Sequence, residues 1–368
     1  MPLPLIIGAA ALATAAFGAK KGYDGYQKHS EADEIVENAK YRYDETRSIF
    51  DDQEKETADS LEMLGRKELD IGQSLSDFKT LADNLLQQLN AGRQNKLEIP
   101  LPKHELQRIE NYSYTAIGVL GSVAGAGMAG AAAGFAVYGG VMTLGAASTG
   151  TAISALSGAA ATKATMAAIG GGSLATGGLG IAGGTAILGA AVAAPVLAIA
   201  GWAYDSHGEE ALRNARKARD EVNAAIEKLE RATEQHANIE NYARKIKQTL
   251  LSIYDQFSLY FDSLKDIDNF LEDAKGRNAD IGDALSNFND EIMRIIENGY
   301  ALASILVDVI TTPIFKLKKV GAAQKIAKDA NGAPIMETDA DGSRILNDTE
   351  LDKALIQANI SASEVESA

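Results

Sequence analysis

The sequence predicts an all-α protein. We expect a long antiparallel, coiled-coil-like helical stalk, with an apolar Gly-zipper helical hairpin inserted between its two long helices. Three observations predict this fold class. Residues 111–204 contain a single charged residue, Lys163. On both sides of this insert, apolar residues recur every three or four positions, as in a helical bundle. Aromatic residues make up only 6% of the chain, fewer than a β-sandwich usually needs.

The composition argues against several classes of function. The 368 residues carry a formal net charge of −15, whereas a nucleic-acid partner requires a basic surface. The chain has no Cys, which excludes disulfides and thiolate chemistry. None of the four His residues stands at metal-ligand spacing from another His, and the Gly-rich stretch has no P-loop ending. We therefore predict no enzyme activity, no cofactor and no metal site.

Residues 1–28 begin with an apolar run from Leu3 to Ala19, which is followed by Lys20 and Lys21. A length of about 17 residues is at the lower limit for a membrane-spanning helix. The basic pair after the run indicates a short anchor whose C-terminal side is cytoplasmic. A buried or interfacial apolar helix is the alternative.

The first long helical segment covers residues 29–110. Its main helical pattern runs to about Leu89, where Ala91-Gly92 and two prolines end it, and a new helix starts near His104. The second half of the pattern has an apolar seam with alternating three- and four-residue steps: Leu61, Leu64, Glu68, Ile71, Leu75, Phe78, Ala82, Leu85 and Leu89. Only Glu68 interrupts the apolar character of this seam, which is typical of a coiled coil or bundle.

The second long helical segment covers residues 205–320. Its seam is the longest in the chain and consists of Ile239, Ala243, Ile246, Leu250, Ile253, Phe257, Tyr260, Leu264, Ile267, Leu271 and Ala274. Gly276 is expected to end this helix. His236 occupies a seam position of this helix and is interpreted as a bundle residue and not a metal ligand. The apolar run from Gly299 to Phe315 follows, and we favour a buried bundle helix there because Asp308 would be costly in hydrocarbon.

The tail, residues 321–368, is rich in Asp, Glu, Ser, Asn and Gly, and we expect it to be mostly disordered. Asp339, Asp341 and Gly342 are similar to part of a calcium-binding loop. The Glu required at the twelfth position of such a loop is absent. The pattern therefore favours a solvated turn over a calcium site.

The insert, residues 111–204, has rows of small residues at four-residue spacing. Residues four apart share one face of a helix, and small residues there let helices associate closely in lipid. The residues that we expect to form these helix contacts, within the protein or between copies, are Gly118, Gly121, Gly125, Gly130, Gly134, Gly172, Gly180 and Gly184. Lys163 lies among Ser and Thr residues and is expected at the turn of the hairpin. Four shorter crossings, and an insert folded into the protein's own core, are the alternatives.

The ends of the insert indicate its orientation. Basic residues stand outside both ends, which predicts that the two long helices lie on one side of the membrane, the cytoplasmic side. Tyr112 and Tyr114 at one end, and Trp202 and Tyr204 at the other, are typical of an interfacial aromatic belt. We therefore expect a membrane-associated protein, in a bacterial inner membrane, with most of its chain in the cytoplasm.

The run from Ser148 to Gly189 resembles a Gly/Ala-rich, glycine-zipper segment of membrane-associated bacterial proteins of unknown function. In those proteins similar charged helical segments flank it. The resemblance covers about a quarter of this chain and names no activity. More loosely, the layout of long amphipathic helices around an apolar hairpin is similar to that of α-helical pore-forming toxins.

Two hypotheses on function follow from these patterns. In the first, the protein is a non-enzymatic, membrane-inserting homo-oligomer that forms pores through the Gly-zipper hairpin, as a toxin or defence effector does. In the second, the hairpin only anchors the chain in the lipid bilayer. The coiled coil then acts as a scaffold or adaptor that recruits a protein partner, such as a membrane-remodelling GTPase or a signalling protein.

Overall fold

The structure is a computed structural model. It describes residues 22–91, 96–122, 131–139, 208–277, 281–321, 325–327, 334–340 and 342–367. Several predicted features lie outside these ranges: the apolar run at the N-terminus, the proposed turn at Lys163, the two aromatic residues Trp202 and Tyr204, and the glycines Gly125, Gly130, Gly172, Gly180 and Gly184.

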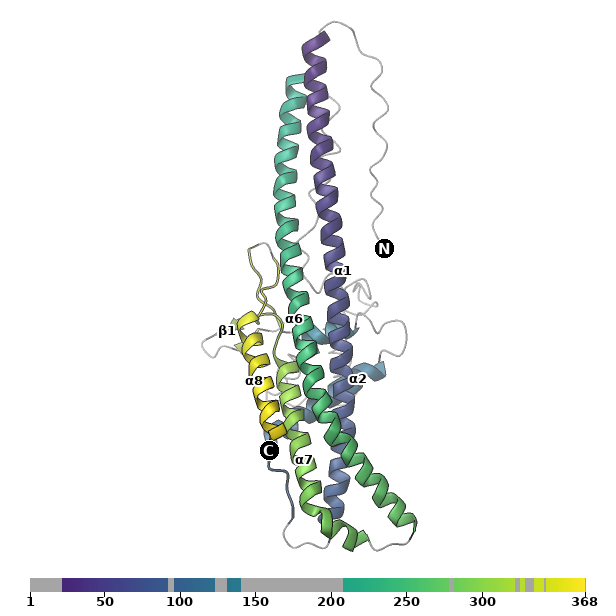
Figure 1. Ribbon diagram of the computed structural model, residues 1–368. Helices are drawn as coiled ribbons and strands as arrows, with labels where there is room; N and C mark the ends of the chain where they lie inside the picture. Colours follow the sequence, from purple (N-terminus) through teal and green to yellow (C-terminus); the bar gives the residue numbers. More distant parts are fainter. Residues whose placement is uncertain are drawn as a thin grey trace. The chain divides into compact units, whose positions relative to one another are not determined.

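Helices make up most of the described chain, which confirms the all-α class (Figure 1). They are α1 (Gly22–Leu89), α2 (Lys103–Ser122), α6 (Gly208–Gly276), α7 (Ile281–Thr311) and α8 (Asp348–Ser367), together with a helical segment at 131–139. Strands β1 (Lys319–Val320) and β2 (Lys325–Ile326) pair antiparallel, with Lys319 opposite Ile326. Helices α1 and α6 end where their seams and terminal glycines predicted.

The chain divides into two compact units. The first unit contains α1 as far as Thr57 and α6 as far as Asn238. Its small core consists of Ala39, Tyr43, Phe50, Val222, Ala225, Ile226, Leu229 and Ala232. The second unit contains the remainder of α1 and α6, with α2, the segment 131–139, α7, the strands and α8.

In the first unit, α1 and α6 run in the same direction. Near the start of each helix, Arg216 lies 3.6 Å from a carboxylate oxygen of Glu31. Further along both helices, the hydroxyl of Thr57 donates a hydrogen bond of 3.1 Å to the main-chain carbonyl of His236. Because residue numbers rise together along the two helices, their packing in this unit is parallel.

The second unit has the same parallel order. Lys247 contacts Met63, with 3.7 Å between Nζ and Sδ, and Lys275 donates a hydrogen bond of 3.1 Å to Gln88. The predicted antiparallel pairing of the two long helices is therefore wrong. An apolar seam identifies the face that a helix buries, but its three- and four-residue steps read almost alike in either direction. The seams consequently predicted which faces pack and left the direction open.

A cluster of aromatic rings lies in the core of the second unit. Phe78 on α1 contacts Phe257 on α6 and Tyr300 on α7, with ring centroids 5.2 and 5.1 Å apart in edge-to-face geometry, a favoured arrangement of aromatic pairs. Gly299 makes room for this cluster, since a Cβ there would lie 2.3 Å from the ring of Phe78. Leu306 on α7 is fully buried. The interpretation of this apolar run as a buried bundle helix is thus confirmed as far as Thr311, where α7 ends.

Helix α8 corrects the expectation of a mostly disordered tail. Its buried residues are Leu351, Leu355, Ala358 and Ala362, spaced by three or four positions so that they share one face. This face packs on α7. Two of its four members are alanines among Ser, Asn and Glu, so the average composition concealed the apolar stripe.

Ahead of α8, the chain forms isolated antiparallel bridges between Phe315 and Leu346, Leu317 and Met336, and Thr338 and Arg344. The last of these bridges spans the sequence that is similar to a calcium loop. Gly342 there adopts a positive φ of 86°, which suits a turn. In the described part of the chain, no group of three or more His, Asp or Glu side chains is placed to hold a metal ion.

Candidate functional site

The described start of the insert packs against a face of α1 that carries two glycines. Gly65 and Gly72 stand seven positions apart in α1, about two helical turns, and so share one face. A Cβ at Gly65 would lie 1.8 Å from the carbonyl oxygen of Ala132, and a Cβ at Gly72 would lie 2.3 Å from the Cβ of Ala116. Both distances are shorter than any real contact. Only glycine lets the insert approach α1 this closely, and we call Gly65, Glu68 and Gly72 the cradle.

The insert contributes small and aromatic side chains to this contact. Ala116 on α2, with Ala132 and Phe135 in the segment 131–139, has no exposed surface. The rings of Tyr112 and Phe135 lie 6.0 Å apart. For these residues, the structure agrees with the alternative in which the insert belongs to the protein's own core.

Glu68 lies between the two glycines of the cradle, and only 2% of its surface is exposed. Within the described residues its Oε2 has no hydrogen-bond partner. Burial without a partner disfavours the charged form, and it raises the pKa of the Glu68 carboxyl well above its usual range. The break in the seam is therefore an ionisable group at the contact between α1 and the insert.

Tyr112 joins the insert to the cradle. Its hydroxyl donates a hydrogen bond of 2.6 Å to the main-chain carbonyl of Glu68, which satisfies the polar end of a buried ring. Burial, together with the charges of Glu68 and Asp70, raises the pKa of Tyr112 well above its usual range. The prediction that Tyr112 belongs to an interfacial aromatic belt is wrong, because the ring is fully buried. Tyr114 is 46% exposed.

The structure describes three of the predicted zipper glycines and shows no close approach at Gly121. Gly118 is half-buried in α2, and Gly134 is buried in the segment 131–139. Gly121 is exposed, and a Cβ there would have no atom within 4 Å. Close approaches between α1 and the insert occur at Gly65 and Gly72, which the sequence reasoning missed. The available signal was two glycines inside a strong heptad pattern, where each costs about 1 kcal/mol relative to Ala.

A second buried ionisable group lies in the first unit. The imidazole of His236 is packed against the ring of Phe50, with 5.2 Å between centroids. Its Nδ1 has no partner among the described residues, and burial lowers the pKa of His236. His236 is thus a buried bundle residue, as its seam position predicted.

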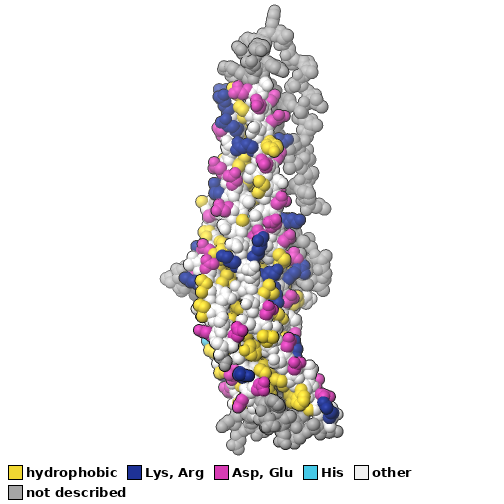
Figure 2. Space-filling model, viewed as in Figure 1, with side chains coloured by type: hydrophobic (Ala, Val, Ile, Leu, Met, Phe, Trp, Pro, Cys, Tyr) yellow, Lys and Arg dark blue, Asp and Glu magenta, His cyan; other side chains and the backbone are white. Residues whose placement is uncertain are grey.

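On the face drawn in Figure 2, charged groups of both signs are interspersed with hydrophobic side chains. None of the helices in the described ranges is both long enough and apolar enough to cross a membrane. Comparisons with protein-family models, with curated proteins and with solved structures found no match for this chain.

Proposed function

We propose that this chain is a non-enzymatic helical protein that stores the beginning of its Gly/Ala-rich insert against α1 and inserts the released segment into a lipid bilayer. One observation carries the proposal. Two glycines of α1 provide a close-fitting surface for an insert that has one charged residue between Asn111 and Tyr204. Such a surface keeps apolar helix away from water until a membrane is available.

The composition of the insert supports storage followed by transfer. So many glycines make a poor helix in water. In lipid, the same small residues let helices pack closely, where no hydrophobic effect between helices exists to drive association. A segment of this kind needs protection in water and gains contacts in a bilayer.

The burial of Glu68 supports release of the insert from the cradle. An unpaired buried carboxyl is costly to ionise, so the contact between the insert and the cradle is weaker wherever the ionised form is favoured in water. A well-packed Leu at this seam position would hold the insert more firmly. The position thus favours a contact that forms and opens over one that only fills a core.

The finer features of the proposal follow from the sequence. The insert forms a hairpin that turns near Lys163, and its glycine rows associate copies of the chain into a pore, as in a toxin or defence effector. The long helices remain on the cytoplasmic side of a bacterial inner membrane. The parallel order of α1 and α6 replaces the antiparallel stalk in this scheme.

A membrane-anchored scaffold is the second candidate. It is favoured by Tyr41 and Ile49, which are 69% and 56% exposed on the part of α1 that belongs to the first unit. Eight positions apart, they lie near one face of the helix. Exposed large apolar groups on one face suit a coiled-coil partner, such as a membrane-remodelling GTPase or a signalling protein.

A reversible disulfide tests the proposal. The native chain has no Cys, so Gly72→Cys with Ala116→Cys introduces one pair at the cradle, where the two backbones are close enough to be bridged after a small shift. The oxidised protein is expected to leave dye-filled liposomes sealed, because the insert stays attached to α1. Reduction of the same sample should start dye release.

The single variant Ala116→Cys is the matched control and should release dye in both redox states. Equal release from the oxidised and reduced double variant would refute storage at the cradle. Liposomes that stay sealed with the native chain and with the reduced double variant would refute pore formation and favour the scaffold.

A further inference from the structure

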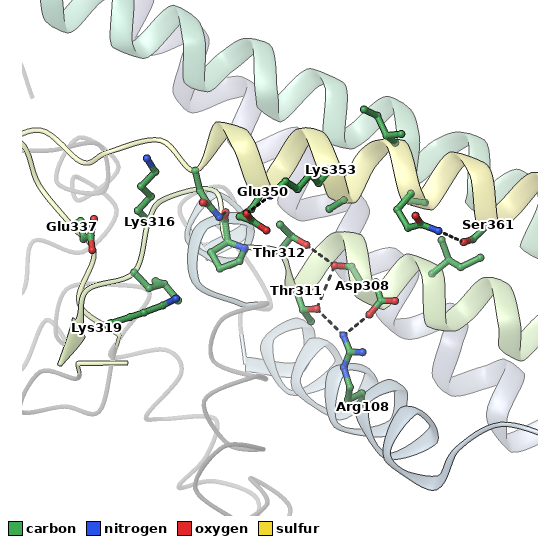
Figure 3. Close-up of a pocket in the computed structure, with 18 residues that line it drawn as sticks. Arg108, Asp308, Thr311, Thr312, Lys316, Lys319, Glu337, Glu350, Lys353 and Ser361 are labelled. Atoms are coloured by element: carbon green, nitrogen blue, oxygen red, sulfur yellow. Dashed lines mark hydrogen bonds and ion pairs between the residues drawn. The ribbon is translucent and has the colours of Figure 1, made fainter. Parts of the chain in front are cut away.

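A cleft of about 1120 Å³ opens in the second unit between α2, α7, the chain that follows α7, and α8 (Figure 3). It lies outside the cradle, and none of the cradle residues lines it. Its volume is slightly larger than the usual range of ligand sites, which is about 300–1,000 Å³. A bound molecule with a body of some length, and not a single ion, matches a space of this size.

At the centre of the cleft, side chains of α2 and α7 are joined by an ion pair and hydrogen bonds. Arg108 on α2 lies 2.6 Å from a carboxylate oxygen of Asp308 on α7 and donates a hydrogen bond of 3.1 Å to the hydroxyl of Thr311. The hydroxyl of Thr312 donates to the main-chain carbonyl of Asp308 at 2.8 Å. Figure 3 shows these bonds as one connected group. These bonds fix the end of α7, and the guanidinium of Arg108 is already paired with a carboxylate.

Two of the three lysines that line the cleft differ from the third in having no ion-pair partner among the described residues. Lys316 and Lys319 line it from the segment after α7, beside Glu337 (Figure 3). Lys353 on α8 pairs with Glu350 at 2.9 Å. With the described residues, neither Lys316 nor Lys319 forms an ion pair. The cleft is lined by four cationic residues and three acidic ones, a local positive excess in a chain of net charge −15.

Apolar side chains line the cleft beside these lysines. Ile305 and Leu317 are partly buried against the core of the unit. Ile356 on α8 is 62% exposed although it is a large aliphatic residue. A ligand that covered Ile356 would remove this apolar surface from water, at about 25 cal/mol per Å².

We propose that this cleft binds an amphiphilic anion, in which a carboxylate or phosphate head is attached to an alkyl chain. Lys316 and Lys319 hold the head, since ammonium groups without ion-pair partners are the natural ligands of such an anion. The part of the alkyl chain next to the head packs against Ile305, Leu317 and Ile356. A free fatty acid and an anionic phospholipid share this chemistry. The proposal does not depend on membrane insertion by the Gly-rich insert.

Oleate is the first probe, titrated into the full-length protein by calorimetry. Lys319→Gln is expected to weaken oleate binding about tenfold, the loss of one charge-assisted contact. Lys318→Gln is the matched control, because Lys318 is the adjacent residue, is exposed and does not line the cleft. Equal losses in both variants would show a general effect of charge and would overturn the proposal.

A second pair of variants tests whether the cleft binds the alkyl chain of the ligand. Ile356→Ser should weaken oleate binding, whereas Ile360→Ser should not, because Ile360 lies one turn further along α8 and does not line the cleft. Acetate lacks the chain and oleyl alcohol lacks the charge, so neither should compete with oleate. Competition by either compound, or binding of oleate that both isoleucine variants leave unchanged, would contradict the assignment.

Vesicles distinguish the two sources of the anion. If the ligand is a free fatty acid, oleate binds in the absence of vesicles and Lys319→Gln weakens it. If it is a phospholipid, binding to phosphatidylglycerol vesicles exceeds binding to phosphatidylcholine vesicles and depends on Lys319 but not on Lys318. Absence of both kinds of Lys319-dependent binding would overturn the proposal. Because the readout is binding and not dye release, its failure is separate from a failure of the storage proposal.

Discussion

The hydroxyl of Tyr112 lies 2.6 Å from the main-chain carbonyl oxygen of Glu68, to which it donates a hydrogen bond. Both residues are buried, and the bond joins α2, at the start of the insert, to the cradle on α1. The hydroxyl uses the main chain of Glu68, while the carboxyl oxygen Oε2 has no partner among the described residues. The contact thus combines a satisfied polar group with an unsatisfied ionisable one.

Glu68→Gln should stabilise the protein at neutral and alkaline pH. The folded-state pKa of Glu68 is raised above its unfolded value by burial. Stability from the neutral carboxyl is therefore fully present below the unfolded pKa of about 4.3 and is lost as the pH rises through the folded pKa. The variant should be more stable than the native chain by at least about 1 kcal/mol near pH 8.

Urea unfolding between about pH 4 and pH 8 measures this difference. The titratable group that interacts with the charge of Glu68 is Tyr112 on α2, and it remains in the variant. Glu98→Gln, at an exposed position, is the control and should leave the pH dependence unchanged. If Glu68→Gln also left it unchanged, ionisation of Glu68 would have no part in the stability of the cradle.

Gly72→Leu should destabilise the second unit by more than about 2 kcal/mol, because the new side chain has to enter space held by Ala116. Gly121→Leu is the matched change on α2, where a Cβ meets nothing within 4 Å. There, the gain in helix propensity should make the change neutral or stabilising. Urea unfolding midpoints compare the two. Equal midpoints would contradict the close approach of the insert to α1.

The seams predicted a good deal of this fold because heptad spacing reports directly on the buried face of a helix. They predicted the ends of α1 and α6, the bundle position of His236 and the core position of Glu68. They did not predict the direction of pairing, since direction depends on how the chain returns between helices. In the structure it returns along α1: Ala116 packs at Gly72, and Ala132, further along the chain, packs at the earlier Gly65.

The candidate site was harder to predict than the fold. A glycine inside a helix becomes informative only when its partner is known, and the sequence does not pair Gly65 with Ala132. Helix α8 was missed for a related reason, as alanines form half of its buried stripe. Close contacts through small residues depend on the shapes of both helix surfaces. The buried face of a helix with large apolar residues, in contrast, can be predicted from the spacing of those residues in one sequence.

Leu351→Ala should test the docking of α8. Leu351 is 1% exposed in the core of the second unit, and truncation of a buried Leu costs about 2–5 kcal/mol. Ile360→Ala, on the half-exposed face of the same helix, should change stability by less than about 0.5 kcal/mol. Chemical denaturation followed by circular dichroism measures both. A neutral Leu351→Ala would mean that α8 does not contribute to the core.

His236→Leu should remove an acid sensitivity from the first unit. Burial lowers the folded-state pKa of His236. The stability from the neutral imidazole is present above the unfolded pKa of about 6.5 and is lost as the pH falls through the folded pKa. Hydrogen exchange of residues 208–238 should therefore accelerate on acidification in the native chain, after correction for the intrinsic pH dependence, and much less in the variant.

His104→Gln is the control for His236, because His104 is 74% exposed and belongs to the second unit. It should leave the acid response of residues 208–238 as it is in the native chain. An acid response that persists in His236→Leu would assign the sensitivity to other groups.

Gly121→Leu separates storage of the insert from its assembly in a membrane. In the stored state Gly121 faces open space, so the change should leave the unfolding midpoint of the protein unchanged or slightly higher. In a bilayer, the glycine rows are proposed to associate copies of the chain, and a Leu in such a row separates the helix backbones. We therefore expect the variant to fold normally, to reach liposomes and to lose its oligomers.

Chemical crosslinking in liposomes measures the oligomers, and dye release measures the pores. Gly125→Leu and Gly180→Leu, which change the same proposed rows, should also abolish oligomers while the long helices remain folded. If all three variants assembled as the native chain does, the zipper would not be the means of association. The exposed apolar face of α1 at Tyr41 and Ile49 would then be the next surface to test, because a parallel helix pair that presents such residues buries them on pairing with another copy.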